Sequence, residues 1–227
     1  MDYPTLIYDG PFSDGLDNRS FLGLSGAPIS ADQAAEIARA LLNDRQVLGL
    51  SPVESMDLPV ESYDLDVETR EGTFSVGLTR TGGKLLYLLP NFSVNEERLS
   101  VEQCIESGLN FLNNHGFGEM QPSYHQKLQG ILTVNFASVQ QGVLLYPDLV
   151  KLQISMADGS VIGLEAANYW RNHVHRTALT PELSLSQAQE SISDRLEVRS
   201  SRLCVIPLET GEALCYELEA HLDDAQY

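Results

Sequence analysis

Apolar and polar residues follow two distinct rhythms in the first third of this chain. Between residues 34 and 42 the apolar side chains return every three or four positions, which is typical of one face of an amphipathic helix. Segments 63–67 and 74–78 alternate apolar with polar residues, and 85–89 is a short apolar run, as expected of β-strands. We therefore predict a helix that ends before Gly49 and three antiparallel strands after it.

The same order of elements returns twice further along. A second helix is predicted over residues 100–114 and a third over 184–197. The predicted strands lie at 132–136, 150–156 and 160–165 in the second copy and at 202–206 and 214–220 in the third. Asp158-Gly159 is a strong two-residue hairpin signal, because both turn positions favour positive φ. The third copy lacks the final hairpin of the other two.

Each of the three helices begins with the same short phrase. An aliphatic residue precedes Ser30, Ser100 and Ser184, and Gln follows each serine three positions later. Ser-x-x-Gln is a capping box, in which the Ser hydroxyl and the Gln side chain satisfy free backbone N–H groups of the first turn. The copies are too widely spaced for a solenoid repeat and suit small domains in series. Such repetition of one module is typical of a binding protein.

A helix followed by an antiparallel meander belongs to the α+β class. We expect three tandem modules, each a helix packed on an antiparallel sheet. The predicted boundaries are a lead-in at 1–28 that packs on the modules, and modules at 29–97, 98–180 and 181–227, the last incomplete. Because a unit of this size has only a marginal core, the modules are expected to pack against one another.

The acidic composition argues against two classes of partner. Only 14 Lys and Arg stand against 32 Asp and Glu, which gives a formal net charge of −18 over 227 residues. Nucleic acid and anionic membranes both require clustered cations, so we expect contact with neither. No apolar run reaches the roughly 20 residues of a membrane span, and no signal peptide is recognisable. The short third copy favours a soluble piece of a longer protein over a cytosolic protein.

Several stretches carry a resemblance to a known family. They are YPTLIYDGPFSD at 3–14, YPDLVK at 146–151, DGSVIGLEA at 158–166, NYWRNH at 168–173, LCVIP at 203–207 and LCYE at 214–217. Together with the helix-then-strands order, they resemble the tandem PepSY modules in the C-terminal soluble part of the YpeB family of spore germination proteins. The resemblance extends over nearly the whole chain.

This resemblance implies a non-enzymatic role with no cofactor, no catalytic residues and no metal. Family members are needed alongside a cortex-lytic cell-wall hydrolase of the spore, SleB, and the two depend on each other for stable deposition. The family begins with a membrane-anchoring helix that is absent here. This chain is thereby expected to be an extracytoplasmic part, in the region of the spore inner membrane and cortex, with its oligomeric state left open.

Histidines provide the strongest candidate for metal chemistry. His173 and His175 would lie on one side of an extended segment and, with Asp148 or Glu165, could hold a metal ion. The favoured alternative is a surface or loop pair beside two arginines. No H-E-x-x-H, G-x-S-x-G or Walker motif is present to support an active site.

Cysteines are few and fit no metal-binding pattern. Cys104 together with His115 would suggest a thiol nucleophile. However, the position of Cys104 on the inward face of a helix favours a small buried side chain. Cys204 and Cys215 flank a predicted hairpin and would lie near one another across its strands. The sequence leaves open whether they form a disulfide.

Tyr169, Trp170 and His173 are the candidate partner-binding residues. Trp170 is the only tryptophan, and it lies between the strongest hairpin signal and the start of the third copy. Tyr and Trp are enriched in binding hot spots, although a plug between two modules is the favoured alternative for this pair. An unpaired sheet edge is a second route by which a partner strand would bind.

Three hypotheses for function follow. The leading one is an interaction protein that binds and stabilises or regulates a SleB-like hydrolase without turnover. The second is an inhibitor of a secreted protease, a role suggested for PepSY segments in some propeptides. The third is a metal-dependent hydrolase that uses His173 and His175.

Overall fold

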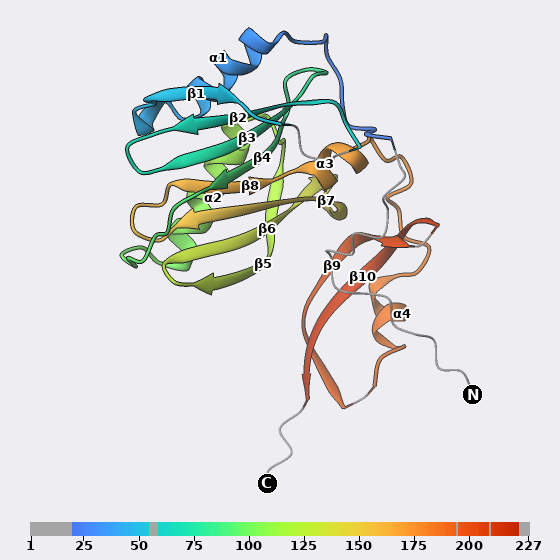
Figure 1. The fold of residues 1–227 in the computed structure, drawn as a ribbon. Coiled ribbons are helices and arrows are strands. Elements are labelled where there is room, and N and C mark those ends of the chain that lie inside the picture. The colour runs from blue at the N-terminus through green and yellow to red at the C-terminus, as the bar shows by residue number, and fades with distance from the viewer. Residues whose placement is uncertain (1–19, 55–58, 194, 209, 223–227) are drawn as a thin grey trace, which may run out of the picture.

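The fold consists of one long antiparallel sheet and a hairpin that projects from it (Figure 1). The computed structural model describes residues 20–54, 59–193, 195–208 and 210–222. The helices are α1 (Ala31–Leu41), the short 3-10 turn η2 (Asn43–Arg45), α2 (Val101–Asn114), α3 (Ala167–Asn172) and α4 (Leu185–Gln189). The strands are β1 (Gly49–Pro52), β2 (Ser62–Glu68), β3 (Thr73–Thr79), β4 (Leu85–Pro90), β5 (Met120–Leu128), β6 (Ile131–Gln140), β7 (Val143–Ser155), β8 (Val161–Glu165), β9 (Leu196–Leu208) and β10 (Gly211–Leu222).

The first two predicted modules share a single sheet instead of having one each. The strand order is β1-β2-β3-β4-β8-β7-β6-β5, and β4 and β8 join the two halves through Tyr87 opposite Glu165 and Leu88 opposite Leu164. This edge-to-edge pairing satisfies backbone groups that two separate meanders would leave open. The predicted α+β class with an antiparallel sheet is confirmed.

The core lies on one face of this sheet. Strand periodicity places one apolar residue from each of six neighbouring strands in a single buried row: Leu65, Val76, Leu88, Leu164, Leu152 and Val134. A cavity of about 420 Å³ between the end of α1 and the middle of α2 is also lined by Leu88, so both helices cover the same face. The row and the two helices form one continuous apolar core.

Close approach of α2 to the sheet depends on Gly108. An ideal Cβ at this position would lie 2.9 Å from atoms of both Phe136 and Ile154, closer than side chains tolerate. Cys104 and Leu112, on the same face of the helix, are fully buried. The absence of a side chain at Gly108 therefore lets the backbone of α2 settle on the apolar row.

All three predicted capping boxes are present. In each, the Ser hydroxyl accepts from the Gln backbone N–H, and the Gln side-chain oxygen accepts from the Ser N–H, at Ser30, Ser100 and Ser184. The first predicted helix, expected to end before Gly49, is present as Ala31–Leu41, and the helix predicted over 100–114 is confirmed as Val101–Asn114. The repeated phrase thus specifies three helix starts correctly, whatever follows each of them.

The predicted third helix over 184–197 is wrong in length. α4 ends at Gln189, and β9 already begins at Leu196, which lies opposite Leu222 of β10. After Gln189 the chain turns, with the N–H groups of Ser191 and Ile192 donating to the carbonyls of Ala188 and Gln189, and from Leu196 onward its backbone pairs along the long hairpin. β1 and β5 were not predicted, because both are edge strands and β5 is largely exposed and polar.

The lead-in can be followed from residue 20. Residues 1–19 lie outside the described part of the chain. Phe21 and Leu24 pack against the core, and the N–H groups of Leu22 and Gly23 donate to the carbonyls of Arg171 and Trp170 at 3.0 and 2.9 Å. The described end of the lead-in therefore packs beside α3 on the sheet unit, by which we mean strands β1–β8 with α1, α2 and α3.

None of the helices in the described ranges combines the length and apolar character that a bilayer crossing requires.

Candidate interaction site

The β9–β10 hairpin is attached to the sheet through β7. Leu144 and Leu145 of β7 lie parallel to Cys204 and Val205 of β9, and two small apolar clusters fill the junction. Beyond this junction the hairpin extends away from the sheet with α4 beside it (Figure 1). The hairpin and α4 therefore form a second unit, which we call the hairpin unit (residues 181–222).

A buried ion network fixes the hairpin unit to the sheet. Asp148 of β7 is fully buried, and Arg176 donates to both of its carboxylate oxygens at 2.8 and 2.9 Å. The same guanidinium donates to both oxygens of Glu212 on β10, each at 2.7 Å. Arg176 thus links a strand of the sheet to a strand of the hairpin through two bidentate pairs.

Arg176 keeps its charge in this setting. Burial acts to lower the pKa of the guanidinium, but hydrogen bonds and charges from Glu212 and Asp148 outweigh it and raise that pKa above its ordinary value. Asp148 could not lie unpaired at this depth, since an isolated buried carboxylate is strongly unfavourable. The network is therefore a permanent part of the junction.

A second polar cluster lies farther along the hairpin. Glu217 of β10 accepts from the Tyr146 hydroxyl at 2.5 Å and from Arg202 at 2.8 Å through each oxygen. Burial, followed by the hydrogen bond to Glu217, raises the pKa of Tyr146 to about 12. Together with Arg176, this cluster holds one face of the hairpin against β7.

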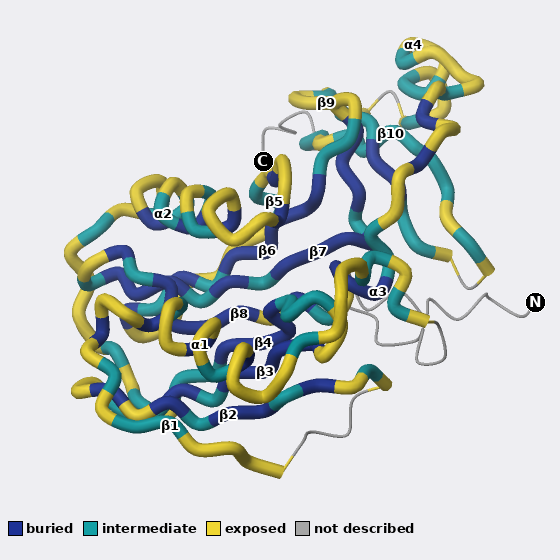
Figure 2. The backbone as a smooth tube through the Cα atoms, turned by 90° about the horizontal axis from the view of Figure 1, so that it is seen from above, coloured by how far each residue is buried: buried dark blue, intermediate teal, exposed yellow. Residues whose placement is uncertain are grey.

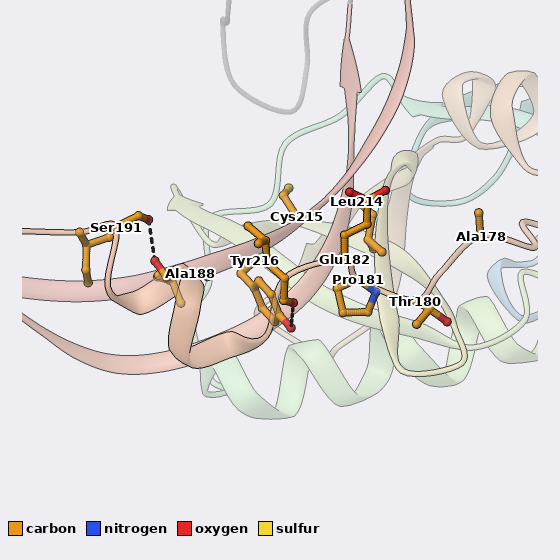
Figure 3. A pocket seen from close by; sticks show the side chains of 12 residues that line it. Ala178, Thr180, Pro181, Glu182, Ala188, Ser191, Leu214, Cys215 and Tyr216 are labelled. Atoms are coloured by element: carbon orange, nitrogen blue, oxygen red, sulfur yellow. Dashed lines mark hydrogen bonds between the residues drawn. The ribbon is translucent and has the colours of Figure 1, made fainter.

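The other face of the hairpin is incompletely covered. A cavity of about 740 Å³ lies between the segment 178–183, α4 and β10 (Figure 3). Its apolar lining includes Pro181, Leu183, Ala188, Ile192, Leu214 and Leu218. Leu183 is 57% exposed, and α4 contains no buried residue. We call this cavity the hairpin groove; its size is in the range of ligand or peptide pockets.

An unpaired strand edge lies beside the hairpin groove. Within the described ranges β10 pairs only with β9, so backbone groups on its outer edge, between Gly211 and Leu222, have no strand partner. Leu214, Tyr216 and Leu218 alternate along this strand and line the groove. Such an edge can add the extended backbone of another protein, while its side chains enter a neighbouring pocket.

The surroundings of the hairpin groove are acidic. Glu182 lines the groove, and Glu190 at the end of α4 is also exposed. The chain as a whole carries a formal charge of −18. These charges favour a partner segment with basic residues, because complementary charge promotes both encounter and specificity.

Tyr169 and Trp170 lie in the interior. They are 2% and 5% exposed, and they donate to the carbonyls of Phe117 and Leu85 at 3.1 and 2.8 Å. Because Leu85 belongs to the first predicted module and Phe117 to the second, the pair occupies the position of a plug between them. Their burial favours that interpretation over surface anchors.

His173 is the accessible member of the predicted trio. Its side chain is 39% exposed, its ring stacks on Tyr169, and its Nδ1 lies 2.8 Å from Asp148. The sequence left Asp148 or Glu165 open as a partner of the two histidines; His173 contacts Asp148, and Arg176 donates to both oxygens of that carboxylate. Glu165 instead pairs with Lys151. Within the described ranges, no group of three or more His, Cys, Asp and Glu could hold a metal ion.

The three cysteines are free thiols. Cys104 is fully buried, and burial raises the pKa of its thiol, so its environment is that of a packing residue. Cys204 and Cys215 lie directly opposite each other, with their sulfur atoms 3.6 Å apart. The predicted proximity of the two is confirmed.

Sequence reasoning missed Arg176 and Glu212 as residues of the junction. One signal was available, because Asp148 interrupts the apolar stretch 143–150 of β7 and so requires a cationic partner if it is buried. The sequence did not identify which of 14 cations would provide it. The groove itself leaves no sequence signal, since it results from where α4 ends.

Comparison with known proteins extends this picture. A family model described as YpeB sporulation, PepSY1 and PepSY2 domains, matches residues 1–179. Proteins named sporulation protein YpeB are similar over most of the chain. The protein from Halalkalibacterium halodurans is 29% identical, in a match that covers 88% of this chain and 45% of the relative. The protein from Bacillus subtilis is 25% identical, in a match that covers 92% of this chain and 50% of the relative.

A solved structure has a similar fold. The C-terminal domain of Bacillus megaterium YpeB superposes with a TM-score of 0.79 at 27% identity, covering 88% of this chain and 90% of that one. The chain spans about half the length of the curated relatives it matches. The match to the two PepSY domains covers the sheet and ends before the hairpin unit.

Proposed function

Because the chain belongs to the YpeB family of sporulation proteins, we propose that it is a non-catalytic interaction protein of spore germination. In this proposal it binds and stabilises or regulates a SleB-like cortex-lytic hydrolase. It acts outside the cytoplasm, in the region of the spore inner membrane and cortex, by surface complementarity and without turnover. The sheet unit serves as a rigid support, and the hairpin unit receives the partner.

The observation that carries this proposal is the hairpin groove beside an unpaired strand edge. A partner segment would extend along β10 and hydrogen-bond to its free backbone groups. Its alternate apolar side chains would enter the groove beside Leu183, Leu214 and Leu218. Basic residues on its other face would meet the acidic surroundings.

The domain division supports the same interpretation. We propose modules at 29–97 and 98–180, fused through their sheets, and a third, incomplete PepSY-like module at 181–227. In the described part of 181–222, the third has a capped helix and two strands, fewer strands than either of the other two. A strand from the partner would extend its sheet and cover its exposed apolar face.

Binding of this chain to a purified cortex-lytic hydrolase, measured by calorimetry, tests the proposal. The Leu183→Asp variant places a charge in the groove and should weaken binding by roughly 10- to 100-fold, since burial of one leucine contributes about 1.5–3 kcal/mol. Leu128→Asp is the matched control, because Leu128 is 64% exposed on β5 at the far edge of the sheet. It should bind like the unaltered chain.

Two outcomes would contradict the proposal. No complex at micromolar concentrations of the unaltered chain would remove its basis. Equal weakening by both substitutions would show that binding occurs but does not use the hairpin groove.

A further inference from the structure

The Cys204–Cys215 pair has the geometry of a disulfide that has not yet formed. The two residues lie directly opposite each other in the antiparallel register of β9 and β10, and their sulfur atoms are 3.6 Å apart. Directly paired residues of antiparallel strands have Cα atoms about 4.5–5.5 Å apart, within the range that a disulfide bridges. Bond formation therefore requires no change of strand register.

We propose that Cys204 and Cys215 are a modification site that low-molecular-weight disulfides oxidise to a cross-strand disulfide in the folded protein. The two thiols differ in access. Cys215 is half-buried, whereas Cys204 is only 2% exposed. Cys215 is thus the thiol that meets the reagent, and Cys204 is the thiol that closes the bond.

The exchange balances in two steps. The Cys215 thiolate attacks one sulfur of the small disulfide, forms a mixed disulfide and releases one small thiolate. The Cys204 thiolate then attacks the Cys215 sulfur, forms the protein disulfide and releases the second small thiolate. The two protons of the protein thiols end on the two small thiols, so one disulfide is exchanged for another.

The environment of Cys204 fits the closing role. Burial raises the pKa of its thiol to about 12, with further contributions from its hydrogen bond to Cys215 and from the Cys215 and Glu217 charges. Such a thiol reacts poorly with external reagents. It lies in contact with the sulfur that it must attack, however, so local concentration compensates for low reactivity.

Closure would fix the base of the hairpin unit. Cys204 packs with Leu144 and Leu149 of β7 in one of the junction clusters, and Cys215 packs against the same cluster. A covalent bond here would hold both hairpin strands together on the face that packs against β7. This modification is independent of the identity of any partner protein.

The experiment uses the folded chain treated with oxidised glutathione under native conditions, followed by intact-mass measurement and peptide mapping. The unaltered chain should lose the mass of two hydrogen atoms and yield a single cross-link between Cys204 and Cys215, reversible by dithiothreitol. Cys204→Ser should instead retain one glutathione on Cys215. Cys215→Ser should remain largely unmodified, because its remaining cysteines are buried.

Three results would overturn the inference. They are a stable glutathione adduct on Cys215 of the unaltered chain, a cross-link that includes Cys104, and the absence of any native-state reaction while the denatured chain reacts fully. The Cys104→Ala variant provides the matched control, since it should form the same cross-link to the same extent.

Discussion

The sheet and the hairpin unit begin with the same capping phrase but differ in what they bury. Behind Ser100, the helix covers an apolar row in which several side chains are fully buried. Behind Ser184, α4 buries no residue and leaves the hairpin groove open. Figure 2 shows the same contrast, with buried strands in the sheet and mostly intermediate or exposed backbone around α4.

A shared local signal therefore does not determine a shared tertiary role. The sheet unit has its own core, whereas the hairpin unit depends on contacts with β7 and on Arg176. An element with an open apolar face and a free strand edge is suited to bind another chain.

The largest expected effect is loss of packing in the sheet. Phe136→Ala removes a fully buried ring beneath α2 and should lower the free energy of unfolding by about 3–5 kcal/mol. Leu218→Ala, in the groove, should lower it by less than about 1 kcal/mol, because little of its packing exists to be lost. Chemical denaturation measures both, and equal losses would contradict the comparison.

Breaking the ion network should loosen the hairpin unit alone. Arg176→Ala leaves the carboxylate of Asp148 buried without its main partner, at a cost of about 3 kcal/mol. Hydrogen exchange should therefore accelerate in β9 and β10 and stay unchanged in β2 and β3. Arg176→Lys keeps the charge but loses both bidentate pairs, so it should give an intermediate result. Uniform acceleration across the sheet would argue against two units.

The capping boxes at Ser100 and Ser184 should contribute differently to the free energy of unfolding. Ser100→Ala should reduce the free energy of unfolding by about 1 kcal/mol, the usual cost of a lost N-cap. Ser184→Ala should leave global stability unchanged, because α4 contributes no buried side chain. Thermal unfolding of the two variants, compared with the unaltered chain, checks this, and a larger effect at Ser184 would contradict it.

The smallest expected effect is an acid sensitivity of the hairpin. Although burial opposes it, hydrogen bonds from Arg202 and Tyr146 lower the pKa of Glu217 below its ordinary value of 4.5. A carboxylate whose pKa is lower in the folded state stabilises the fold at pH values above its ordinary pKa. This stabilisation is lost as the pH falls through the lowered pKa. Hydrogen exchange in β10 should thus accelerate as pH falls below about 4.5, after correction for the intrinsic rate. Glu217→Gln should show a weaker dependence.

Local signals in the sequence predicted much of the sheet. The alternation around Val76 or Val134 specifies strands within a few residues. The hairpin predicted at Asp158-Gly159 is present, but the prediction of a two-residue turn is wrong, because the strands end at Ser155 and resume at Val161 and only Gly159 has positive φ. The pairing of β4 with β8 was not predictable, because it joins residues far apart in the chain. Edge strands such as β5 carry no apolar alternation, so their pattern resembles that of a loop.

The candidate site was harder to predict from the sequence than the sheet was. Tyr169 and Trp170 are chemically suited both to a hot spot and to a core plug, and only burial separates the two roles. The hairpin groove depends on the early end of α4 and on the attachment of β10 to β7 through Arg176, which are tertiary features. The cysteine pair was predicted well, because cross-strand proximity follows from hairpin symmetry.

The most direct test is hydrogen exchange along β10 in the presence and absence of the cortex-lytic hydrolase. Backbone amides between Gly211 and Leu222 and in the segment 178–192 should become protected on binding, while β1 and β5, the outer edges of the sheet, stay unchanged. Protection at β1 or β5 with none at β10 would contradict the account.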